Sequence, residues 1–118
     1  LKSVVIQHRT LDSFVNEKGL CPNLIKIDTK GNEINILKGA VQTLSKECAV
    51  VIFECSAGED RREIWNLFQK MNYVIASLPI ISINRIVLFD KDSFEMDDKT
   101  NFIALPRLFQ KNGSGWNF

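Results

Sequence analysis

The chain has 118 residues, of which 45% are apolar and 25% are charged, so its composition suits one globular domain and excludes a disordered chain. Its 15 basic and 14 acidic side chains are mixed along the sequence, and the net charge of +1 excludes the basic surface typical of proteins that bind nucleic acids or anionic membranes. No apolar run approaches the roughly 20 residues that span a bilayer, and residues 1–10 lack a signal-peptide pattern, so a cytoplasmic location is expected.

The cysteine and histidine content argues against a metal site. Cys21, Cys48 and Cys55 are odd in number and lack CxxC spacing, so we expect neither a disulfide framework nor a metal centre. They are predicted to be free thiols, buried or half-buried. His8, the only histidine, has no cysteine or carboxylate at a spacing that would complete a set of ligands.

The first elements in chain order are a strand and a short helix. Residues 3–8 alternate loosely between apolar and polar side chains, which predicts a strand. Thr10 can cap a helix that ends at Gly19, and the apolar side chains between them share one face.

The next segment has the pattern of a βαβ unit. Residues 24–28 form an apolar run with one lysine, typical of a strand that is buried on both faces. Asn32 can cap a helix that runs to Leu44, in which Gly39 would allow close packing against a sheet. Residues 49–53 form a second buried strand, so the two strands are expected to be parallel.

A second helix and a third strand follow. Ser56 and Glu59 have the spacing of a capping box for a helix whose apolar face includes Trp65 as a core residue. The mixed charges of residues 60–63 indicate a solvated helix surface. Residues 73–78 have the pattern of a strand.

After Pro79 the alternation of strands and helices stops. Residues 86–89 and 102–105 are short apolar runs separated by a polar stretch, and we expect antiparallel strands with no helix between them. The tail, residues 107–118, is rich in glycine and asparagine and is expected to be loosely ordered, with Trp116 docking back.

Asp28 and Glu54 each end a predicted buried strand. Open α/β sheets bind ligands beyond the carboxyl ends of their strands, where a carboxylate can orient a hydroxyl or amine or act as a base. The same carboxylates can instead cap a helix or accept backbone N–H groups. Both interpretations stay open for Asp28, and the structural one is favoured for Glu54.

These residues carry a resemblance to a known family. The segment LIKIDTKGNEINILKGAVQTL, followed by VVIFE, resembles the signature of FkbM-type methyltransferases, in which a strand ends in Asp-x-Glu-Gly-x-Glu and a helix carries a Leu-x-Gly-Ala turn. Thr10-Leu11-Asp12 resembles the start of that family's preceding helix, and the run NFIALP resembles its final strand.

The resemblance implies an α/β fold with a Rossmann-like methyltransferase sheet, mostly parallel and with antiparallel C-terminal strands. Residues 1–106 would be the C-terminal half of the domain. The strands that begin near residues 24, 49, 73 and 102 would be the fourth to seventh strands of a seven-stranded sheet, the last of them antiparallel.

The resemblance also implies a function. Members of the family transfer a methyl group from S-adenosylmethionine, typically to a hydroxyl oxygen of a sugar, polyketide or related metabolite, so a small-molecule acceptor is expected. By matching position, Asp28 and Glu33 would be catalytic, and Lys30, Gly31 and Glu54 would lie on the substrate side of the cleft. Asp28 would take the proton of the acceptor hydroxyl or hold that hydroxyl in line.

Two departures from the family pattern affect this hypothesis. Lys30 stands where the family has glutamate, and this reversal of charge implies either an anionic acceptor or a loss of activity. No glycine-rich turn of the kind that holds the donor precedes Asp28, so cofactor-binding residues are not assigned. We expect the N-terminal strands and the donor half of the site in a segment that precedes Leu1.

Two alternatives to a methyltransferase fit parts of the sequence. Residues 28–31 also match the Asp-x-x-Gly switch of GTPases, but the GxxxxGK[ST] loop that such proteins need does not occur in the chain. A non-catalytic α/β interaction module, or a degenerate methyltransferase remnant, stays open because of Lys30 and the missing donor segment. The sequence carries no signal for an oligomeric state.

Overall fold

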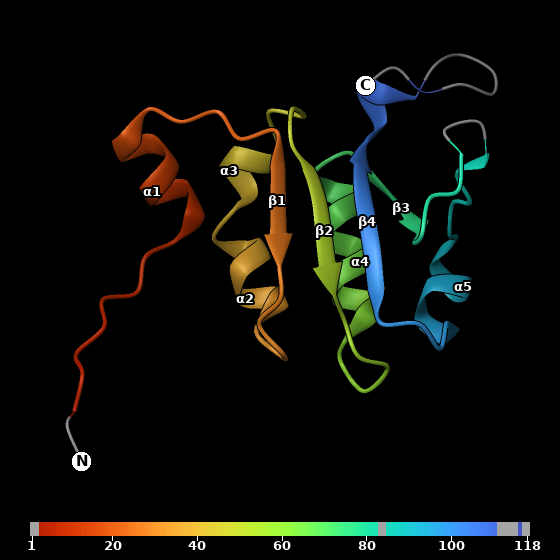
Figure 1. Ribbon diagram of the computed structural model, residues 1–118, viewed down its shortest axis with the longest axis horizontal. Helices are drawn as coiled ribbons and strands as arrows, with labels where there is room; N and C mark the ends of the chain where they lie inside the picture. Colours follow the sequence, from red (N-terminus) through yellow and green to blue (C-terminus); the bar gives the residue numbers. More distant parts are fainter. Residues whose placement is uncertain (1–2, 83–84, 111–115, 117–118) are drawn as a thin grey trace.

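A computed structural model describes residues 3–82, 85–110 and 116. Its strands form one mixed sheet with the order β1-β2-β4-β3 (Figure 1). The strands are β1 (Leu24–Ile27), β2 (Val50–Glu54), β3 (Tyr73–Ser77) and β4 (Asn101–Pro106). The helices are α1 (Leu11–Lys18), α2 (Glu33–Lys38), α3 (Val41–Leu44), α4 (Arg61–Lys70) and α5 (Lys91–Met96), followed by a 3-10 helix (Arg107–Phe109).

The sheet confirms the βαβ unit and corrects the expected strand pairing. β1 and β2 are parallel and are joined by α2 and α3, as predicted. β4 is antiparallel to both of its neighbours, β2 and β3, so only one of the three pairings is parallel. The prediction that most neighbouring strands pair in parallel was therefore wrong, because β4 lies between β2 and β3 and separates two strands that run in the same direction.

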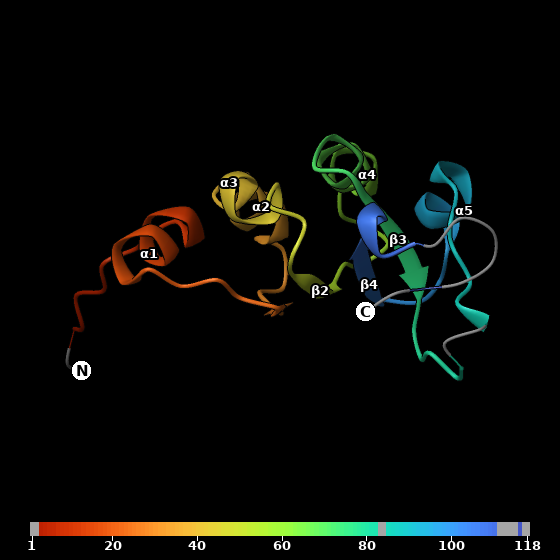
Figure 2. The ribbon, with the colours of Figure 1, turned by 90° about the horizontal axis from the view of Figure 1, so that it is seen from above.

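One face of the sheet carries the main core. Figure 2 shows α2, α3 and α4 on the same side of the sheet, with α1 out beyond the edge that β1 forms. Beneath them, the ring of Phe53 on β2 lies 5.1 Å from Phe68 on α4 and 5.6 Å from Phe102 on β4. Phe94 of α5 joins this group at 4.9 Å from Phe102. All four rings are at most 1% exposed, and each contributes about 1.5–3 kcal/mol by burial.

The opposite face has a smaller cluster made by β3 and β4. Val74, Ala76, Ile103 and Leu105 are buried there, and Trp116 packs against them, which confirms that Trp116 docks back. Trp116 also forms a β-bridge with Gln110. The other residues of the predicted loose tail beyond Gln110, 111–115 and 117–118, lie outside the described residues.

Two predictions near the start of the chain were wrong. Residues 3–8 are not a strand, because no strand of the described chain pairs with them, and Val4, Val5 and Ile6 are at least 70% exposed. β1 is not buried on both faces, because it lies at the edge of the sheet and Leu24 is 62% exposed. The predicted ends of α1 are confirmed: Thr10 Oγ1 accepts a hydrogen bond from Ser13 N at 3.0 Å, and Gly19 has a φ of 64°.

The helix predicted from Asn32 to Leu44 is two helices, divided at Gly39 and Ala40. A Cβ atom at Gly39 would lie only 3.0 Å from the Cβ of Thr10, so this glycine admits the start of α1 and not, as expected, the sheet. Asn32 makes no capping bond to the backbone, and its Oδ1 accepts instead from the Asn35 side chain at 2.9 Å.

Asp12 of α1 caps the second of these helices. Its carboxylate accepts hydrogen bonds from the backbone N–H groups of Gln42 at 3.0 Å and Thr43 at 2.8 Å, and from the Thr43 hydroxyl at 2.7 Å. Because these N–H groups have no partner within α3, the cap explains how a four-residue helix can form. The Thr10-Leu11-Asp12 motif therefore contains the caps of two different helices.

The predictions for the C-terminal half need three corrections. α4 begins at Arg61 and is capped by Asp60, whose Oδ1 accepts from Glu63 N at 3.0 Å, so Ser56 is not the cap. A helix, α5, does lie in the polar stretch before β4, where Asp90 and Ser93 form a capping box. Residues 86–89 form no strand and make only a bridge to β3. Trp65 packs against the core, as expected.

Arg61 was expected on a solvated surface, but it is 3% exposed. Its guanidinium donates to four backbone carbonyls: Phe94 at 2.9 Å, Asp97 at 2.5 Å, Cys55 at 2.9 Å and Lys99 at 2.7 Å. It also lies 5.1 Å from the centroid of the Phe102 ring. Arg61 thus ties the end of β2 to α5 and to the segment that leads into β4.

Candidate functional site

The carboxyl ends of β1 and β2 bring two predicted site residues together. Ile27 pairs with Phe53 in the parallel register, so Asp28 and Glu54 occupy neighbouring positions at the same edge of the sheet. A hydrogen bond between their carboxyl groups, together with repulsion from the Asp28 charge, raises the pKa of Glu54 above its ordinary value of 4.5. The positive charge of Lys30 lowers the pKa of Glu54, so the Lys30 ammonium lies close enough to act on this carboxyl pair.

The turn after Asp28 has an uncommon backbone conformation. Lys30 has a φ of 52° and Gly31 a φ of 111°. The second value favours glycine, and the first costs a non-glycine residue about 1–2 kcal/mol. Such conformations persist where surrounding contacts hold them, and they occur often at ligand sites.

Glu33 supplies the contact that holds this turn. Its side chain is 1% exposed, and its Oε2 accepts a hydrogen bond from Gly31 N at 3.0 Å. Burial raises the pKa of Glu33, but hydrogen bonds from the Glu59 side chain and from nearby backbone N–H groups outweigh it and hold the pKa below 4.5. Glu33 is therefore an ionised acceptor inside the fold.

Glu59 is a site residue that the sequence reasoning did not assign. Burial, followed by its hydrogen bond with Glu33, raises its pKa above 4.5. Its Oε1 also accepts from Ser56 N at 3.1 Å, which is one half of the bonding that the capping-box spacing predicted. We call the group formed by Asp28, Glu33, Glu54 and Glu59 the acid rim.

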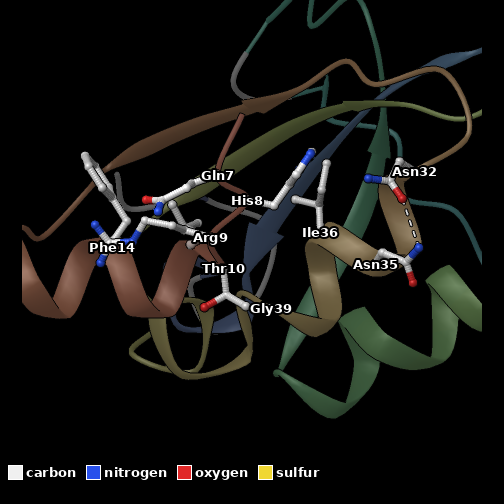
Figure 3. A pocket seen from close by; sticks show the side chains of 10 residues that line it. Gln7, His8, Arg9, Thr10, Phe14, Asn32, Asn35, Ile36 and Gly39 are labelled. Carbon is white, nitrogen blue, oxygen red and sulfur yellow. Dashed lines mark hydrogen bonds between the residues drawn. The ribbon is translucent and has the colours of Figure 1, made fainter. Parts of the chain in front are cut away.

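A pocket of about 590 Å³ lies between the start of α1 and the α2 segment (Figure 3). It is lined by residues before and in α1 and by residues of the α2 segment: Gln7, His8, Arg9, Thr10, Leu11, Phe14, Asn32, Asn35, Ile36 and Gly39. None of the predicted site residues lines it, but Asn32 directly follows Gly31, so the pocket adjoins the turn. Its wall combines apolar side chains with amides and an imidazole.

The charge of Arg9 in this pocket is already paired. Its guanidinium forms an ion pair with Glu17 and donates to the hydroxyl of Ser13 at 3.1 Å. It also lies 5.7 Å from the centroid of the Phe14 ring. The remaining polar side chains that line the pocket include His8 and Asn35.

Comparison with known proteins assigns the family. A family model described as the Methyltransferase FkbM domain matches residues 1–75, which is more than half of the chain. The chain belongs to this family. The match includes the acid rim and the residues that line the pocket, and it ends within β3. The comparisons with curated proteins and with solved structures gave no match.

All five site residues predicted from the sequence lie within the part of this FkbM domain that the family model matches. Asp28 and Lys30 are exposed, Glu54 is half-buried and Glu33 is buried. Asp28 and Glu54 are in contact, and Glu33 is bonded to Gly31. The acids accessible from outside are therefore those at the strand ends, whereas Glu33 faces inward.

In the part of the FkbM domain that the structure describes, no group of three or more His, Cys, Asp or Glu side chains is arranged to hold a metal ion. No helix in the same residues combines the length and apolar character needed to cross a membrane.

All three cysteines of this FkbM domain are free thiols, but their predicted burial was only partly right. Cys21 and Cys48 are exposed because they lie in connecting segments, and only Cys55 is buried. Burial, assisted by the charge of Glu59, raises the pKa of the Cys55 thiol to about 11.

Proposed function

We propose that this chain supplies the acceptor side of an S-adenosylmethionine-dependent methyltransferase that methylates a hydroxyl oxygen of a small molecule or sugar. The observation that carries the proposal is the acid rim, which lies beyond the carboxyl ends of two parallel strands in a chain of the FkbM family. Ligands of open α/β sheets bind at this edge.

The fold supports the larger architecture that the sequence leads us to expect. β1, β2 and β3 point the same way, and the last strand is antiparallel to its neighbours. We propose that residues 1–106 are the C-terminal half of a Rossmann-like methyltransferase domain and that the four strands are its fourth to seventh. The half that binds the donor nucleoside would then lie in a preceding segment.

The acid rim suits one end of the donor. S-adenosylmethionine supplies an electrophilic methyl group on a sulfonium cation, and the net negative charge of the acid rim favours a positive charge beside it. Asp28 is exposed at the strand end, so its oxygens are accessible to an acceptor hydroxyl. The proton released from that hydroxyl would pass to the carboxyl pair that Asp28 forms with Glu54.

Glu33 would contribute through the turn. Its bond to Gly31 N fixes the backbone between Asp28 and α2, so the position of Asp28 depends on Glu33. The acceptor would occupy the neighbouring pocket, because its volume of about 590 Å³ is within the range of roughly 300–1,000 Å³ typical of small-molecule sites.

A substitution that keeps the shape of the side chain and removes its carboxylate tests the role of Asp28. In the full-length protein, Asp28→Asn should lower kcat for methyl transfer by about 100-fold or more, because a positioned base contributes on the order of 10²–10⁴. The affinity for S-adenosylmethionine should change far less than kcat, because the half that binds the donor nucleoside is untouched. Asp92→Asn, which alters an exposed carboxylate on α5, is the matched control. A variant at position 28 that keeps more than half of the activity would rule out this role.

Lys30 defines the expected class of acceptor. Its ammonium is exposed on the turn next to the acid rim, so we propose an acceptor that carries an anionic group, such as a carboxylated or phosphorylated sugar. Lys30→Ala should reduce kcat/KM for anionic acceptors by about tenfold and leave neutral acceptors unaffected. An equal effect on both classes would contradict the assignment.

A further inference from the structure

Glu33 has one carboxylate oxygen whose environment the turn does not explain. Oε2 is bonded to Gly31 N, but Oε1 is buried and receives no hydrogen bond from any N–H or hydroxyl group of the described residues. An ionised oxygen in this situation is strongly unfavourable unless a donor reaches it. The residue is 1% exposed, so solvent does not supply that donor.

The group that reaches Glu33 is the carboxyl of Glu59. The two side chains are hydrogen bonded, and a carboxylate is an acceptor only, so this contact requires a proton on one of the two. Glu33 is the partner with a buried oxygen that lacks a donor, so the proton belongs on Glu59, and the lowered pKa of Glu33 and the raised pKa of Glu59 agree with this placement. Glu59 itself is anchored by the bond from Ser56 N to its Oε1.

We propose that Glu59 is a positioning residue, which as a neutral acid donates its O–H to Glu33 and so holds the turn that carries Asp28. The sequence of contacts runs from Ser56 N to Glu59, from Glu59 to Glu33, and from Glu33 to Gly31 N. It connects the segment after β2 to the turn after β1. As far as catalysis is concerned, the inference rests on the proposed methyl transfer.

Other titratable and charged groups lie near this pair. Lys38 of α2 and Glu63 of α4 form an ion pair at 2.8 Å across the same interface. The remaining titratable and charged groups nearby are Asp28, Lys30, Glu54, Cys55 and Arg61. Cys55 stays neutral below its pKa of about 11, so it does not change state in the range where a carboxyl titrates.

The direction of the pH effect follows from the raised pKa of Glu59. The stability that its proton contributes is fully present below 4.5 and is lost as the pH rises through the raised value. Above that value two carboxylates face each other, and their repulsion should loosen the turn. Activity should therefore decline on the alkaline side of the Glu59 titration in the wild-type protein.

Three variants of the full-length protein separate positioning from a general structural role. Glu59→Gln keeps a permanent N–H donor, so we expect kcat within about threefold of wild type and the alkaline decline to disappear. Glu59→Ala removes the donor, and kcat should fall on the order of 10- to 100-fold. Glu63→Gln, the same chemical change at the same helix interface, should keep the wild-type pH profile. If Glu59→Gln instead behaves like Glu59→Ala, or keeps the alkaline decline, the proposal is wrong.

An NMR titration tests the carboxyl pair without any activity. In the wild-type protein the amide proton of Gly31 should shift as Glu59 loses its proton, and Glu59 should titrate above 4.5. In Glu59→Gln the Gly31 signal should no longer respond in that range. A pair that titrates as expected in a protein without methyl transfer would overturn the proposed function alone, whereas a Gly31 signal that ignores Glu59 would overturn the positioning role.

Discussion

Replacing Arg61 by methionine should destabilise the fold by about 3 kcal/mol. Two of the carbonyls that it satisfies, those of Cys55 and Phe94, take part in buried bonds, and each would cost about 1–3 kcal/mol without a donor. The carbonyls of Asp97 and Lys99 are only part-buried and can bond to water. Relief from burying the guanidinium offsets part of the loss, and the methionine side chain keeps the contact with the aromatic rings.

Urea unfolding of the full chain, followed by far-ultraviolet circular dichroism, measures this loss. For a chain of this length a change of 3 kcal/mol corresponds to roughly 10 °C in Tm. Arg61→Lys, which retains some donors, should lose about half as much free energy as Arg61→Met. Arg62→Met is the control, because the Arg62 guanidinium is exposed and bonds to Glu95 at 3.0 Å. The unfolding midpoint of this variant should equal that of the wild type. If Arg61→Met shifts the midpoint no more than this control does, the account of the four carbonyls is incorrect.

Three further predictions address the caps, the acid rim and the buried thiol. Asp12→Ala should lower the free energy of unfolding by about 1–2 kcal/mol, because α3 loses its N-terminal hydrogen bonds. Asp12→Asn should lower it by less, and equal losses for the two variants in urea titrations would count against the cap. Asp28→Asn should move the pKa of Glu54 down toward 4.5 in a carbon-13 NMR titration, and an unchanged pKa would contradict their contact. Cys55, with its pKa raised to about 11, should stay unmodified by a thiol reagent at about pH 8 while the two exposed cysteines react; three equal rates would refute its burial.

The elements predicted correctly are those fixed by local chemistry. The cap at Thr10 and the left-handed residue at Gly19 act within a few residues, so their spacing in the sequence suffices to place α1. The apolar runs of β1 and β2 likewise lie on either side of a segment with helical periodicity, so local patterns suffice to predict the βαβ unit. α5 was missed because it buries only one side chain, Phe94, in an otherwise polar stretch, although its capping box was present in the sequence.

The contacts that were missed join distant parts of the chain. Asp28 and Glu54 could be placed side by side because parallel strands end at the same edge. The partners of Arg61 are backbone carbonyls, one of them 38 residues away, and no side-chain pattern encodes a carbonyl as a partner. Glu59 was read as a cap because its bond to Ser56 is local, whereas its bond to Glu33 depends on how α2 and the segment before α4 approach each other.

The position of β4 affects the order in which the sheet can assemble. β2 and β3 share no hydrogen bonds and are connected only through β4, whose residues follow both of them in the chain (Figure 1). A nascent chain emerging from the ribosome therefore has β1 and β2 ready to pair, whereas β3 has no sheet partner until residues 101–106 have been synthesised. During synthesis the insertion of β4 therefore comes late. Until then the edges of β2 and β3 that later pair with β4 are unpaired and accessible to chaperones.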